Sequence, residues 1–189
     1  WRAHGHPAEA LALCDSLRGA LGDPRVFQRQ RAACLLELDR VEDGVAEAAG
    51  ELAANPLNLP LVRDELLDLL PARSQRERAV SALAQLDRDA PAARLLRAEL
   101  LLRLGRADAA TAATADLADD PAAAQVLLHA ASILAKELPL EPEPGTVRPV
   151  ADWLLATLEK LAGSAAVPRG QQLKVLDLLA GVCEDVLIL

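Results

Sequence analysis

The stretch AARLLRAELLLRLGRADAA, residues 92–110, decides the fold. Two apolar segments with helical spacing flank Gly105, and the chain then runs on to Asp119-Asp120-Pro121. A glycine between two amphipathic helices and a proline after the second are typical of a helical hairpin. The stretch therefore predicts helices at 92–104 and 107–118, joined by a tight turn.

Prolines recur along the chain at nearly regular intervals. Pro24, Pro56, Pro91 and Pro121 are separated by 32, 35 and 30 residues, and the segments between them also read as pairs of amphipathic helices. A period in this range indicates stacked helical hairpins, because one hairpin alone cannot bury its apolar face.

Composition supports an all-α fold. Of 189 residues, 39 are Ala and 39 are Leu, whereas Phe occurs once, Trp twice and Tyr never. The strongest helix formers dominate and the aromatic strand formers are scarce.

Segment 92–121 resembles a tetratricopeptide repeat (TPR). Ala98 and Ala110 stand at the small-residue positions of its two helices, Gly105 at the turn and Pro121 at the end. Segment 26–56 is similar, with Ala33 in its first helix and Arg40 where the turn glycine is usual, and segment 57–91 is looser. The resemblance covers about residues 1–121. It implies a right-handed α-α solenoid that serves protein–protein interaction.

The chain after Pro121 departs from this pattern. We expect residues 122–189 to form C-terminal helices that cap the stack, interrupted by a proline-rich loop at 139–147. Thr146 is the expected cap of a helix that ends near Ala162. A last helix, from about Pro168 to Leu187, is expected to bury one apolar face, made of Leu173, Leu176, Leu179 and Val182. Earlier in the chain, Ser74 and Glu77 have the spacing of a capping box.

Charge argues against nucleic acid as a partner. The net charge is −8, and residues 107–189 hold 5 basic and 12 acidic residues, the opposite of what phosphate binding requires. The same balance disfavours an anionic membrane surface, and no apolar run is long enough to insert into a bilayer.

No residue pattern indicates catalysis, a cofactor or a metal. Phosphate loops, nucleophile elbows and Cys-x-x-Cys pairs are absent from the sequence, and its three histidines lack partners at ligand spacing. Cys14, Cys34 and Cys183 are expected to be buried free thiols, which fits a reducing cytoplasm.

The candidate binding residues follow from the resemblance. In TPR stacks the first helices line a concave groove, and Glu37, Glu65, Asp68 and Glu99 would project into it and favour a basic peptide. The alternative is that these carboxylates only keep the surface soluble.

The sequence thus predicts a non-enzymatic interaction or scaffold module that binds a protein or peptide. Two other functions remain open. The segment could be a helical accessory region of a larger enzyme such as a bacterial glycosyltransferase, or the sensory or oligomerising region of a transcriptional regulator. A catalytic or DNA-binding domain would then lie outside this chain, which opens on Trp1, contains no Met and therefore reads as an excerpt.

Overall fold

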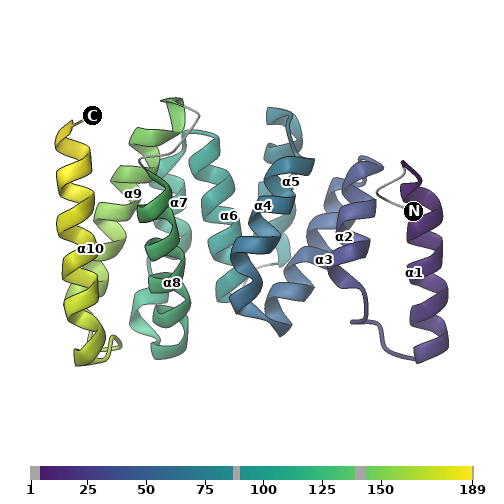
Figure 1. The fold of residues 1–189 in the computed structure, drawn as a ribbon, viewed down its shortest axis with the longest axis horizontal. Coiled ribbons are helices and arrows are strands. Elements are labelled where there is room, and N and C mark those ends of the chain that lie inside the picture. Colours follow the sequence, from purple (N-terminus) through teal and green to yellow (C-terminus); the bar gives the residue numbers. More distant parts are fainter. Residues whose placement is uncertain (1–4, 87–89, 139–143, 189) are drawn as a thin grey trace. The chain divides into compact units, whose positions relative to one another are not determined.

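The computed structural model describes residues 5–86, 90–138 and 144–188, and these residues are helical with no strand (Figure 1). The all-α prediction is confirmed for them. The helices are α1 Pro7–Leu21, α2 Gln28–Glu37, α3 Val41–Ala54, α4 Leu59–Leu69, α5 Arg73–Leu86, α6 Pro91–Arg103, α7 Ala107–Thr114, α8 Pro121–Glu137, α9 Pro144–Gly163 and α10 Arg169–Ile188. Two short 3-10 turns, η2 Pro56–Asn58 and η3 Leu117–Asp119, precede α4 and α8.

The chain forms two compact units, Trp1–Ala93 and Arg94–Leu189. The boundary lies inside α6, whereas the proline spacing suggested a change of architecture at Pro121. The second unit therefore contains both the clearest predicted hairpin and the C-terminal helices.

Within the first unit, each helix packs against nearby helices in the sequence. α2 contacts α1, α3 and α4, and α3 contacts α4 and α5. The core is aliphatic, with Val41, Val45, Leu52 and Leu83 completely buried. Contact between first and second neighbours is how stacked helical hairpins bury their apolar faces.

The second unit follows the same scheme. α9 contacts α7, α8 and α10, and α10 also contacts α8. Trp153 fills its centre at 1% exposure and donates a hydrogen bond from Nε1 to Thr114 Oγ1 (3.2 Å). Leu154 and Leu158, on the same helix as Trp153, are fully buried as well.

The recurring prolines stand at the beginnings of elements. Pro56, Pro91 and Pro121 are the first residues of η2, α6 and α8, while Pro24 lies in the turn before α2. A proline fits the first helical position because its missing N–H would have no partner there. Asp120 adds a cap for α8, since its side chain accepts a hydrogen bond from the Ala123 N–H (2.8 Å).

The structure corrects the register of the predicted repeat by one residue. Gly105 has φ 74°, and the N–H groups of residues 105 and 106 bond the carbonyls of residues 102 and 101. Asp39 has φ 55°, and the same pattern recurs there: the N–H groups of residues 39 and 40 bond the carbonyls of residues 36 and 35. Asp39, rather than Arg40, therefore occupies the glycine position, because aspartate tolerates the left-handed conformation.

With this register, Ala98 matches Ala32 instead of Ala33. Ala110 matches Gly44, where an added Cβ would lie 2.8 Å from Leu36 Cγ and 3.1 Å from the Ala32 carbonyl oxygen. In the first of these hairpins, α3 therefore has no room for a Cβ at Gly44, and Ala110, at the matching position of α7, is fully buried.

Four further local predictions are wrong, at least in part. α5 begins at Arg73, so Ser74 lies inside its first turn, and Gln75 Oε1 accepts from the Ala72 N–H (3.3 Å) instead. Residues 144–147 of the predicted proline-rich loop belong to α9, because Pro144 is tolerated as a first helical residue; residues 139–143 lie outside the described part.

In α10 the predicted buried face is also partly wrong. Leu173 and Leu176 are 69% and 50% exposed, and within residues 169–184 the buried positions are Val175 and Val182. Cys183 is exposed, whereas Cys14 and Cys34 are buried as predicted. Within the described ranges, no helix combines the length and the apolarity that crossing a bilayer requires.

Candidate functional site

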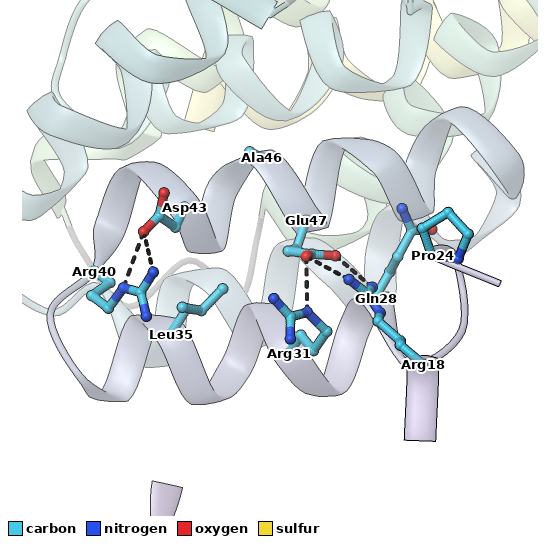
Figure 2. A pocket seen from close by; sticks show the side chains of 9 residues that line it. All are labelled: Arg18, Pro24, Gln28, Arg31, Leu35, Arg40, Asp43, Ala46 and Glu47. Carbon is cyan, nitrogen blue, oxygen red and sulfur yellow. Dashed lines mark hydrogen bonds and ion pairs between the residues drawn. The ribbon is translucent and has the colours of Figure 1, made fainter. Parts of the chain in front are cut away.

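An open cavity of about 450 Å³ lies in the first unit, bordered by α1, α2, α3 and the turn after α1 (Figure 2). α1 contributes Arg18, α2 contributes Gln28, Arg31 and Leu35, and α3 contributes Ala46 and Glu47, with Asp43 and Arg40 at its beginning and Pro24 in the turn. The lining is mostly charged.

Glu47 connects the three helices. Arg18 donates from Nη1 to Glu47 Oε1 (2.9 Å) and from Nη2 to Oε2 (2.7 Å), and Arg31 donates from Nε to Oε1 (2.9 Å). Both guanidinium groups are visible against this carboxylate in Figure 2. The three side chains are only 14–17% exposed, so these ion pairs are partly desolvated and their geometry is fixed.

Further contacts hold the two arginines in place. Arg18 Nε donates to the Val26 carbonyl oxygen (2.6 Å), and Arg31 forms an ion pair with Asp15 of α1. The turn between α1 and α2 allows this approach, because Gly22 adopts φ 66° and its N–H bonds the Arg18 carbonyl oxygen. A left-handed glycine at this place ends the helix without strain.

Gly50 gives Gln28 its place at the cavity. An added Cβ on Gly50 would lie 2.3 Å from Gln28 Nε2. The missing side chain in α3 thus lets the Gln28 amide of α2 lie directly against the α3 backbone.

Burial alone would raise the pKa of the Glu47 carboxyl. Hydrogen bonds from Arg18 and Arg31, together with their positive charges, outweigh burial and hold this pKa below its usual range. Glu47 is therefore ionised at neutral pH.

The rim of the cavity is more open than its interior. Arg40 donates from Nε and Nη2 to Asp43 Oδ2 (3.0 and 2.7 Å), and both side chains are more than half exposed. Such surface pairs contribute little to stability. An incoming charged group can therefore replace one member of this pair at low cost.

A second ionic cluster joins the turn after α2 to α5. Arg78 donates to both carboxylate oxygens of Glu42 (2.8 and 2.7 Å) and to Asp39 Oδ2 (3.2 Å), and Gln75 Nε2 donates to Asp39 Oδ1 (3.0 Å). The hydrogen bonds from Arg78 hold the pKa of Glu42 at about 2. This exposed cluster links the positive-φ turn to the next hairpin, and each of its ion pairs contributes little to stability.

The predicted acidic residues have different environments. Glu37 and Asp68 are exposed on α2 and α4. Glu65 is partly buried, and its Oε2 accepts from Arg29 Nε of α2 (3.1 Å). Glu99 belongs to the second unit and is only 6% exposed. Three of the four residues thus lie on two contacting helices of the first unit, and the role of all four in binding stays a prediction.

Sequence reasoning missed the cavity residues Arg18, Arg31 and Glu47. The available signal was weak: Arg18 follows the buried Cys14 by four positions, and Arg31 directly precedes the buried run 32–36. Arginines next to buried positions indicate an acidic partner, but only the packing of the three helices shows that Glu47 is that partner.

The described residues contain no cluster of three or more His, Cys, Asp and Glu side chains arranged to hold a metal ion. Comparison with models of protein families, with curated proteins and with solved structures finds no match.

Proposed function

We propose that this chain is a protein-interaction module and that the cavity between α1, α2 and α3 binds a segment of a partner protein. The observation that carries the proposal is the cavity itself. Its volume of about 450 Å³ is in the range of roughly 300–1,000 Å³ that is usual for small-molecule and cofactor sites. Its interior charges are held rigid by the Glu47 network, so little ordering is needed when a partner binds.

A basic peptide is the partner chemistry that we propose. The unit around the cavity is acidic, since residues 1–93 hold 15 acidic and 11 basic residues, whereas the cavity lining itself holds three arginines and two carboxylates. Asp43 stands at the rim in an exposed pair with Arg40, and a Lys or Arg of the partner can pair with it. Glu47 already accepts three charged hydrogen bonds, so it keeps the cavity in shape and leaves partner contact to Asp43.

We also propose that the hairpins are degenerate TPR-like repeats of one right-handed solenoid, with the C-terminal helices as its cap. The support lies within each unit, where helices contact their first and second neighbours. The matching turns at Asp39 and Gly105, which are 66 residues apart, add a shared local geometry.

The test is selection of peptides from a random display library on the purified chain, followed by titration of a selected peptide. We expect the selected sequences to be enriched in Lys and Arg, and Asp43→Lys to weaken binding at least tenfold. Asp177→Lys, on α10, is the matched control and should leave affinity unchanged.

Two other outcomes would show that the cavity is not the binding site. If Asp68→Lys weakens binding and Asp43→Lys does not, the cavity is not the site and the predicted α2–α4 surface is. If no peptide is enriched, or if neither Asp43→Lys nor Asp68→Lys changes the affinity, the chain does not bind basic peptides through the first unit.

A further inference from the structure

The charges around the cavity balance once the partner of each lining residue is counted. Arg18 donates from all three of its guanidinium nitrogens, from Nε to the Val26 carbonyl oxygen and from Nη1 and Nη2 to Glu47. Arg31 donates from Nε to Glu47 and pairs through Nη1 with Asp15. These two arginines are therefore neutralised by two carboxylates, and the remaining charges of the lining are Arg40 and Asp43.

The pair of Arg40 and Asp43 is only partly satisfied. Both of its hydrogen bonds end on Asp43 Oδ2, as Figure 2 shows. Among the residues that the structure describes, no group accepts a hydrogen bond from Arg40 Nη1 and none donates to Asp43 Oδ1. The two side chains are 54% and 58% exposed, so a group from a partner can replace either member at low cost.

The backbone beneath this pair is fixed. The Arg40 N–H donates to the Leu35 carbonyl oxygen (2.9 Å), and the Arg40 carbonyl oxygen accepts from the Gly44 N–H (2.9 Å). Asp43 lies in the first turn of α3, where the helix dipole stabilises a carboxylate even without Arg40. Only side chains therefore have to rearrange when a partner binds, which keeps the entropic cost low.

A partner that brings only a basic group gains little at this pair. Its Lys or Arg displaces Arg40 from Asp43, which exchanges one exposed ion pair for another and leaves Arg40 beside a second positive charge. Such like-charge contacts oppose binding. A partner that also brings a carboxylate forms two ion pairs in place of one, and the charges around the cavity stay balanced.

We propose that Arg40 and Asp43 make the cavity selective for a peptide segment with a basic and an acidic side chain on the same side. The basic side chain bonds Asp43 and the acidic side chain bonds Arg40. Residues on the same side are two positions apart in an extended segment and three or four apart in a helix. This inference rests on the proposed peptide binding and specifies the charge pattern of the partner.

The first test uses the peptides selected on the purified chain. We expect Lys or Arg to recur at one fixed spacing from Asp or Glu in the enriched sequences. A selected peptide is then synthesised with both termini blocked, so that only its side chains are charged. Replacing its acidic residue with the corresponding amide should weaken binding about tenfold or more, because one charge-assisted hydrogen bond is lost.

The second test asks whether Arg40 reads that acidic residue. Arg40→Gln should weaken binding of the original peptide about tenfold but should leave the affinity for the amide peptide unchanged or higher, since Asp43 then has no competing partner. Arg73→Gln is the matched control, because it breaks an exposed ion pair with Glu77 in the same unit and should change neither affinity. Circular dichroism of both variants checks that helicity is retained.

The outcomes separate this inference from the proposed function. If Asp43→Lys weakens binding but the amide peptide binds the wild-type chain as tightly as the original, the cavity binds basic peptides without reading an acidic group. The inference is then wrong and the proposed function stands. An Arg40→Gln variant that weakens both peptides equally overturns the inference in the same way. If Asp43→Lys has no effect, both proposals fail.

Discussion

Replacing Glu47 with Gln should destabilise the first unit, because it leaves two arginines without their shared carboxylate. The wild-type side chain accepts three charged hydrogen bonds, from Arg18 and Arg31, at 2.7–2.9 Å. Removing one partner of a fully buried ion pair costs about 3–5 kcal/mol. Since these side chains keep 14–17% exposure, water relieves part of that penalty, and we expect a loss of ~2–4 kcal/mol.

The assay is urea denaturation followed by circular dichroism, with hydrogen exchange of the α1 amides to locate the effect. Exchange should accelerate first in α1, because Arg18 is its charged link to α3. Asp43→Asn is the matched control. It breaks an exposed pair on the same helix and should cost at most about 0.5 kcal/mol. If Glu47→Gln costs no more than Asp43→Asn, the network does not hold the three helices together and the reasoning fails.

The remaining predictions concern packing, burial and pH. Gly44→Ala should destabilise the chain despite the higher helix propensity of alanine, because the added Cβ would clash with the backbone and a buried leucine. Gly181→Ala, which has nothing within 4 Å of the added Cβ, should instead stabilise α10 by up to about 1 kcal/mol. Equal urea midpoints for the two variants would contradict this prediction. Trp153→Phe should cost ~1–3 kcal/mol, since it leaves a buried hydroxyl without its indole donor, and calorimetry of the variant measures that loss. The carboxyl of Glu42 should titrate at a pKa of about 2 by NMR and return to its usual range in Arg78→Gln. Because the pKa of Glu42 is depressed in the folded state, the stability that its ionised form contributes is complete above the ordinary glutamate pKa and is lost as pH falls toward 2. An unchanged Glu42 titration in Arg78→Gln would refute Arg78 as the cause of the depressed pKa.

The sequence by itself determined the fold class and, to within one residue, where α6, α7 and α10 begin. Alanine and leucine at helical spacing specify helices locally. Gly105 marks a turn because it tolerates a positive φ, and Pro91 and Pro121 mark the first turns of helices because their φ is fixed. These are short-range effects, so they can be read without knowing what packs where. The buried Trp153 was likewise predictable, since its helix has one clearly apolar face.

Only the tertiary structure decided which apolar and charged side chains have partners. Leu173 and Val175 are both apolar residues of one helix, yet only Val175 is buried, because burial depends on where neighbouring helices cover α10. Asp39 takes the left-handed turn that sequence reasoning assigned to Arg40, since both positions can end a helix and packing selects one. Glu47 pairs with Arg18 across 29 positions of sequence. Such long-range pairing leaves no periodic signal, because it depends on how three helices meet in space.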